Sequence, residues 1–180
     1  MTGVERPEVL LLDGSYDNTL PMAKELSEDI DAWIIGVGTG PGARLFYSRY
    51  CNETAIVDGG DGYAESLQSL IVDRRPDIVL PVGSRSVVAV NAIRDRIPDD
   101  VRHSLPPPDS LEITIDKRRT ISLAVACDIS VPEDYTDRIE ARAQSRRRDI
   151  PPDLPSPSFL KARRENGESL TAKVEEPDAF

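Results

Sequence analysis

The sequence predicts an α/β protein whose first part holds a doubly wound, mostly parallel sheet. Short apolar runs alternate with segments of helical period from residue 8 to residue 97. Each run is closed by a turn signal, which is typical of strands buried in a parallel sheet. After PPPD, residues 106–109, this alternation stops. The chain is therefore expected to contain one complete domain followed by a different, smaller region.

The elements of the first part follow from these patterns. Leu20, Ala23 and Leu26 recur at helical spacing in the first predicted helix. The predicted strands span 8–14, 32–37, 53–57 and 77–82, and the predicted helices span 19–29, 61–75 and 84–97. Strands and helices that alternate in this way form a parallel sheet covered by helices.

The second part has weaker signals. One or two helices are predicted over 109–129, with Ile121, Ala124 and Val125 facing inward. A charged helix over 137–149 and strands over 158–163 and 169–176 follow, the strands joined by a turn at Asn166 and Gly167. Two strands and these helices are too few to build a core of their own. We expect a domain over 1–108 and the start of a second, incomplete domain over 109–180.

The composition limits the class of function. The net charge is −10, with 32 acidic residues, which argues against general binding to nucleic acid. Arginine-rich, lysine-poor basic residues in an acidic chain resemble proteins of salt-loving organisms. No apolar run reaches the roughly 20 residues of a membrane span, and the start, MTGVERPEV, is not a signal peptide. A cytoplasmic protein without membrane contact is predicted.

The residues that most often bind metal are scarce. Cys51 and Cys127 lack metal-ligand or redox spacing and are expected to be reduced, mostly buried thiols. His103 is the single histidine and is expected in a loop. No metal ligand is therefore assigned within this chain.

Two glycine-containing loops invite a binding interpretation. GVGTGPGA, residues 36–43, fits the glycine spacing of a dinucleotide-binding loop, but it follows the second strand and carries Pro41. Asp13, Gly14 and Ser15 fit either a small anion-binding turn or ordinary turn chemistry. A nicotinamide-dependent enzyme that uses residues 36–43 is one alternative function.

Lys117 and Lys161 lie in contexts that suit a polyphosphate. Lys117 follows Asp116 at the predicted start of a helix, where the amides and the helix dipole favour an anion. Lys161 lies on a predicted strand before a polar turn that ends at Gly167. Each charge-assisted hydrogen bond would contribute about 1.5 to 3 kcal/mol. The alternative is that both are ordinary surface lysines.

These segments resemble a known family. IDKRRTISLAVACDISVPEDY (115–135) followed by PSPSFLKARRENG (155–167) resembles the entry to the nucleotide-binding domain of ATP-grasp ligases. VLLLDGSYDNTLPMAKEL, SRYCNE and DIVLPVGS resemble the α/β domain that precedes the grasp in carbamoyl-phosphate-synthase-like and carboxylate–amine ligases. The resemblance implies a pre-ATP-grasp domain over 1–108 and the first, incomplete part of an ATP-grasp α+β domain over 109–180.

The resemblance also implies site residues. Lys117 and Lys161 would contact ATP phosphates, and Gly167 would lie in a loop over the triphosphate. That loop has one glycine where many members have several, so Arg163 and Arg164 either supply charge instead or are simply solvated. The cofactors implied are ATP and Mg²⁺, with the metal ligands expected outside this chain. No catalytic residue is identified.

The function implied is ATP-dependent activation of a carboxylate as an acyl phosphate, which an amine or ammonia then attacks. The partners would be small-molecule carboxylate and amine substrates, and a homo-oligomer is compatible with the sequence. We expect the chain not to be catalytically complete alone, so whether it is an enzyme stays open. The alternative is a non-catalytic α/β ligand-binding or assembly module. The substrates and the natural length of the chain are not fixed by the sequence.

Overall fold

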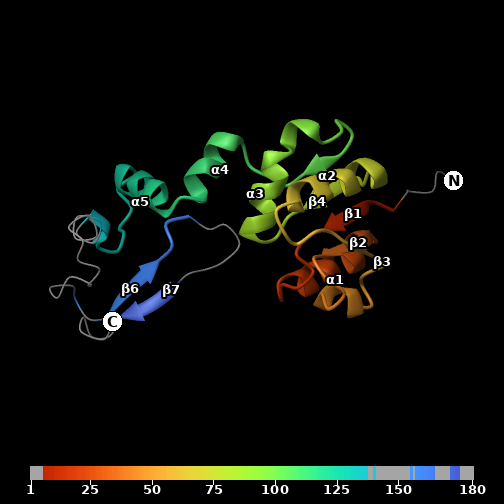
Figure 1. The fold of residues 1–180 in the computed structure, drawn as a ribbon, viewed down its shortest axis with the longest axis horizontal. Helices are drawn as coiled ribbons and strands as arrows, with labels where there is room; N and C mark the ends of the chain where they lie inside the picture. The colour runs from red at the N-terminus through yellow and green to blue at the C-terminus, as the bar shows by residue number, and fades with distance from the viewer. Residues whose placement is uncertain (1–5, 138–139, 141–154, 156, 165–170, 175–180) are drawn as a thin grey trace. The chain divides into compact units, whose positions relative to one another are not determined.

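The computed structural model describes residues 6–137, 140, 155, 157–164 and 171–174. The chain divides into two compact units, Met1–Leu111 and Glu112–Phe180 (Figure 1). Among the helices of these described residues, none is both long enough and apolar enough to cross a membrane.

The first unit is built on a parallel sheet of five strands in the order β3-β2-β1-β4-β5. The strands are β1 (Glu8–Leu11), β2 (Trp33–Gly38), β3 (Glu53–Ile56), β4 (Ile78–Leu80) and β5 (Arg102–His103). The chain leaves β1 in one direction and resumes at β4 on its other side, so the sheet is doubly wound. The predicted fold class is confirmed.

Helices connect the strands. They are α1 (Thr19–Ile30), α2 (Tyr63–Arg74) and α3 (Ser84–Ala92), with short 3-10 helices η1 (Arg44–Tyr47) and η2 (Arg94–Arg96). The single helix predicted over 84–97 is interrupted, because α3 ends at Ala92 and the chain tightens into η2. Residues 44–47 form η1 directly after the glycine-containing loop.

Both faces of the sheet are buried. Alternate residues of β1 point to opposite faces, so Leu10 belongs to one apolar cluster and Leu11 to the other. The Leu10 cluster includes Leu67 and Ile71 of α2, whereas the Leu11 cluster includes Ala23 of α1. Burial on both faces explains why the strands read as continuous apolar runs.

Two expectations about His103 and the two cysteines are wrong. His103 does not lie in a loop; it pairs with Val79 in the edge strand β5. The prediction missed β5 because a strand of two residues has no measurable period. The thiols are also less buried than expected, since Cys127 in the second unit is exposed and Cys51 is half-buried.

The second unit contains helix α5 (Lys117–Ala126) and the antiparallel pair β6 (Ser158–Lys161) and β7 (Thr171–Val174). Helix α4 (Pro108–Thr114) precedes α5, so the segment predicted as one or two helices forms two. The predicted helix over 137–149 and the turn at Asn166 and Gly167 lie almost entirely outside the described residues.

The apolar residues of this unit are more exposed than the sequence predicts. Ile121 and Ala124 are half-buried, but Val125, expected to face inward, is exposed. Phe159 in β6 is 60% exposed. Burial depends on neighbouring elements that a local pattern does not reveal, and a unit of this size offers few.

Candidate functional site

The start of α5 is fixed by the side chain of Asp116. This residue has an extended backbone and occupies the N-cap position. Its carboxylate oxygen Oδ1 accepts hydrogen bonds from the backbone amides of Arg118 at 3.0 Å and Arg119 at 3.3 Å. Aspartate is among the preferred N-cap residues because it satisfies amides that the helix leaves unpaired. Lys117 is therefore the first residue of a capped helix.

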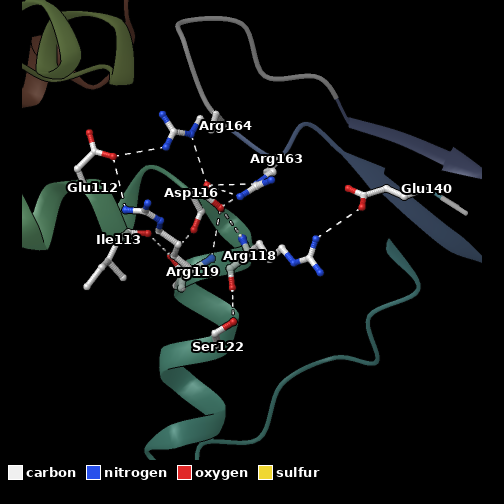
Figure 2. A network of polar contacts seen from close by, with 10 residues as sticks. Glu112, Ile113, Asp116, Arg118, Arg119, Ser122, Glu140, Arg163 and Arg164 are labelled. Carbon is white, nitrogen blue, oxygen red and sulfur yellow. Dashed lines mark hydrogen bonds and ion pairs between the residues drawn. The ribbon is translucent and has the colours of Figure 1, made fainter. Parts of the chain in front are cut away.

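The same carboxylate binds two arginines from the segment after β6 (Figure 2). Arg163 donates through Nε to both carboxylate oxygens at 3.2 Å, and its Nη2 lies 3.1 Å from Oδ2. Arg164 donates through Nε to Oδ2 at 3.4 Å. The Asp116 side chain is fully buried. These hydrogen bonds, with that from Arg163 the largest cause, lower the pKa of Asp116 to about 2.

Backbone contacts join the same two segments. The amide of Lys117 donates to the carbonyl oxygen of Arg163 at 3.0 Å, and Asp116 and Arg164 form an isolated antiparallel bridge. Lys161 ends β6 two residues before Arg163. The structure thus brings the helix that begins with Lys117 against the chain that leaves Lys161.

The strand pair presents one exposed face. Phe159 lies opposite Lys173, and Lys161 lies opposite Thr171. Because side chains two residues apart share a face of a strand, all four belong to the same side, and all four are exposed. Leu160 and Ala172 lie on the other side and are half-buried. An aromatic ring and an ammonium group therefore share the exposed face of β6.

Asp116 lies in a network of ion pairs. Glu112 lies 3.7 Å from Arg119 and 3.4 Å from Arg164, so it is shared between two guanidinium groups. Asp116 is likewise shared between Arg163 and Arg164. Arg118, whose amide donates to Asp116, pairs through its side chain with Asp137 and Glu140. Arginines and carboxylates therefore alternate in this network, and the half-exposed guanidinium groups of Arg163 and Arg164 lie within it.

One sequence-based expectation for this site needs correction. The amides at the start of α5 were expected to be open to an anion. The carboxylate of Asp116 occupies those of Arg118 and Arg119, and the carbonyl of Arg163 occupies that of Lys117. A phosphate at this place would contact side chains rather than these amides. Gly167 lies outside the described residues.

The sequence did not reveal the central role of Asp116. It marked the residue only as the neighbour of Lys117, and it left Arg163 and Arg164 as either charge donors or solvated side chains. The signal available was the pair of arginines directly after the strand, in a chain that is otherwise acidic. A partner 47 residues away cannot be assigned from that signal alone.

The glycine-containing loop of the first unit lacks the context of a dinucleotide site. Such a loop opens an α-helix directly after the first strand. Here it follows β2 and leads into η1, a 3-10 helix of four residues. Gly40 and Gly42 face open space, so close packing does not require a glycine at either position. The geometry disfavours the nicotinamide-dependent alternative.

The turn at Asp13 holds two loops together at the carboxyl edge of the sheet. Asp13 has a φ of 60°, and its carboxylate accepts from the amides of Val82 at 3.1 Å and Gly83 at 2.7 Å. The hydroxyl of Ser86 donates to the same oxygen. These amides belong to the loop that precedes α3. The Asp13 carboxylate therefore fastens its own turn to the loop before α3.

The described part of the chain offers no metal centre. Within residues 6–137, 140, 155, 157–164 and 171–174, no group of three or more His, Cys, Asp or Glu side chains is placed to hold a metal ion. The resemblance places the Mg²⁺ ligands outside this chain.

No protein-family model matches the sequence, and no curated protein matches it. The structure, however, resembles solved proteins. The biotin carboxylase domain of 2-oxoglutarate carboxylase from Hydrogenobacter thermophilus, in complex with MgADP, ADP and bicarbonate, has a TM-score of 0.61 at 12% identity. That match covers 95% of this chain and 38% of the other.

Two further matches are N5-carboxyaminoimidazole synthetases. The Thermotoga maritima enzyme has a TM-score of 0.54 at 17% identity, over 94% of this chain and 42% of that one. The Staphylococcus aureus enzyme has a TM-score of 0.56 at 12% identity, over 94% and 41%. This chain thus spans well under half the length of these structures. It has the fold of their N-terminal part, as the resemblance to carboxylate–amine ligases implies.

Proposed function

We propose that this chain is the ATP-binding N-terminal part of a ligase that activates a carboxylate as an acyl phosphate for attack by an amine or ammonia. The observation that carries the proposal is the junction between α5 and β6. The amide of Lys117 lies 3.0 Å from the carbonyl of Arg163, so the helix that begins with Lys117 meets the segment that directly follows β6 and Lys161. The fold shared with a biotin carboxylase domain in complex with MgADP supports it.

The residues at this junction could bind both the base and the phosphates of a nucleotide. Phe159 and Lys161 share the exposed face of β6. An exposed aromatic ring can stack against a base, and ammonium and guanidinium groups form charge-assisted hydrogen bonds with phosphates. Lys117, at the start of α5, would reach the same phosphates from the helix. The half-exposed guanidinium groups of Arg163 and Arg164 would add further contacts to the phosphates.

The proposed chemistry has two steps. A carboxylate oxygen attacks the γ-phosphorus of ATP, which forms an acyl phosphate and releases ADP. The amine nitrogen then attacks the acyl carbon, so that phosphate leaves and a proton is released. Magnesium bound with the nucleotide would supply charge neutralisation at the phosphates. The described residues of this chain would contact the phosphates of ATP. The groups that bind the carboxylate and the amine would lie outside the described residues.

Substitution of the two lysines tests the proposal. In isothermal titration of the chain with MgATP, Lys117→Ala and Lys161→Ala should each weaken binding about tenfold or more, since each removes a charge-assisted hydrogen bond. Lys24→Ala is the matched control, because Lys24 lies on α1 and pairs with Glu28 of the same helix. The assignment is wrong if neither site lysine differs from this control.

A non-catalytic assembly module is a second candidate, favoured by the apolar surface of the second unit. Leu123, Val125, Ile129 and Phe159 are each about half exposed or more. Such a surface is typical of sites that contact another protein. Analytical ultracentrifugation separates the candidates. A stable dimer that is lost in Leu123→Glu, together with no detectable binding of MgATP, would favour the module.

A further inference from the structure

Asp116 is the one charged side chain in the described part of the molecule that is fully buried. Removing a carboxylate from water is costly unless cations and hydrogen-bond donors compensate for the lost solvation. A helix cap alone does not require this burial, because N-cap residues function well at the protein surface. The position of Asp116 therefore suggests a role beyond capping.

The two oxygens of Asp116 have different partners. Oδ1 accepts from the amides of Arg118 and Arg119 in α5. Oδ2 receives Nη2 of Arg163 and Nε of Arg164, and the Nε of Arg163 lies between the two oxygens. One oxygen thus fixes the helix that begins with Lys117. The other fixes the segment that leaves Lys161.

We infer that Asp116 is a positioning residue that sets Lys117 and Lys161 beside each other. This inference rests on the proposed function for its biological meaning, since it states how the phosphate-binding lysines would be held before the nucleotide arrives. Such preorganisation matters because two flexible side chains otherwise lose conformational freedom on binding. Asp116 itself would not contact the nucleotide, as its oxygens are already occupied.

The low pKa of Asp116 is consistent with this role. The carboxylate stays ionised at neutral pH, because Arg163 and the helix amides stabilise the charged form. Arg163 and Arg164 are about half exposed even though they pair with Asp116. Each guanidinium group has five N–H donors, so both retain donors that face solvent. The ion pairs thus fix the backbone and still leave N–H donors of both arginines open to another ligand.

Chemical crosslinking of the full chain tests the positioning directly. The chain contains four lysines, Lys24, Lys117, Lys161 and Lys173. A short amine-reactive crosslinker followed by peptide mass mapping should link Lys117 to Lys161 and also Lys161 to Lys173. The second link is an internal control, since Lys161 and Lys173 share one face of the strand pair without Asp116.

Asp116→Asn separates positioning from capping. Asparagine caps a helix as well as aspartate does, but it has no charge to pair with Arg163. The ratio of the Lys117–Lys161 link to the Lys161–Lys173 link should fall several-fold, while the helix content by circular dichroism stays unchanged. Arg118→Gln is the matched control, because Arg118 pairs with Asp137 and Glu140 through its side chain and not with Asp116. An unchanged ratio in Asp116→Asn overturns the inference.

A second variant covers the case in which Asp116→Asn disturbs the strand pair. Arg163→Gln removes the principal partner from the opposite side and leaves the cap intact. The same fall in the crosslink ratio is expected, and a ratio equal to that of the wild type overturns the inference even if the first variant is unstable.

The nucleotide is tested separately. If both proposals hold, Asp116→Asn weakens binding of MgATP about tenfold although both lysines are present, because a lysine that is no longer held in place loses its charge-assisted hydrogen bond to the phosphates. A wild-type chain that forms the Lys117–Lys161 link but binds no MgATP contradicts the proposed function and leaves the positioning intact. If Asp116→Asn lowers the crosslink ratio but binds MgATP as tightly as the wild type does, positioning by Asp116 does not contribute to nucleotide binding.

Discussion

At the scale of single residues, protonation of Asp116 should control the start of α5. Its pKa is lowered from the ordinary value of 3.8 to about 2 in the folded chain. A carboxylate with a lowered pKa stabilises the folded state above its unfolded pKa, and this contribution is lost as pH falls through the folded pKa. We expect the stability that Asp116 contributes to fall between about pH 4 and pH 2, and its contacts in the folded chain to be lost only as the carboxyl protonates near pH 2.

The amide resonances of Arg118 and Arg119 report this loss by NMR, because both amides donate to Asp116. They should shift together as the pH falls. In Asp116→Asn the same acid-dependent shift should be absent, since the amide side chain does not titrate. An identical titration in wild type and variant would show that another group is responsible.

The sequence located Lys117 and Lys161 but not the contacts between Asp116 and Lys117 on one side and Arg163 and Arg164 on the other. Spacing and local context identify a helix start and a strand. They do not show that the amides at that start are already taken by Asp116 and Arg163. Such information depends on a pairing across 47 residues, which a single sequence does not contain. That Lys117 and Lys161 bind phosphate stays a prediction.

At the scale of elements, α2 offers a matched pair of neighbouring apolar residues. Ile71 is fully buried in the core cluster, whereas Val72 beside it is 44% exposed. Ile71→Ala should lower the free energy of unfolding by about 2 to 5 kcal/mol through lost burial and a cavity. Val72→Ala should change it by about 0.5 kcal/mol or less.

Urea unfolding followed by fluorescence measures both variants. The chain has one tryptophan, Trp33, which lies in β2 and packs against the same core cluster. Its emission therefore reports the first unit. Equal effects of the two substitutions would contradict the placement of α2 against the sheet.

The elements differ in how far their sequences predict them. Leu10 and Leu11 belong to an apolar run closed by a turn, and this run alone indicates a strand buried on both faces. Strand β5 has two residues and no period, so it was missed. Phe159 was assigned to the correct strand but not to an exposed face. Exposure depends on what packs against the element, which the local pattern does not state.

At the scale of the whole molecule, the order of strands and helices was predictable, because alternation of period along the chain specifies a doubly wound sheet.

The net charge is a second property of the whole chain, and it predicts how salt affects stability. An excess of ten negative charges repels itself more strongly in the compact state than in the unfolded chain. Exposed ion pairs oppose this repulsion, but each contributes only about 0 to 1 kcal/mol.

Salt should therefore stabilise the protein. The Debye length falls from about 10 Å at 0.1 M to about 3 Å at 1 M, so added KCl screens the long-range repulsion between surface carboxylates. Salt also weakens the surface ion pairs, such as that of Arg75 with Asp100 at 2.6 Å, but these contacts are short and screened less than distant charges are.

We expect the Tm at pH 7 to rise between 0.1 and about 1 M KCl. Near pH 4.6, where the net charge approaches zero, the same rise should largely disappear because little repulsion is left to screen. A Tm that falls with KCl at pH 7 would mean that the ion pairs outweigh the repulsion of the excess carboxylates.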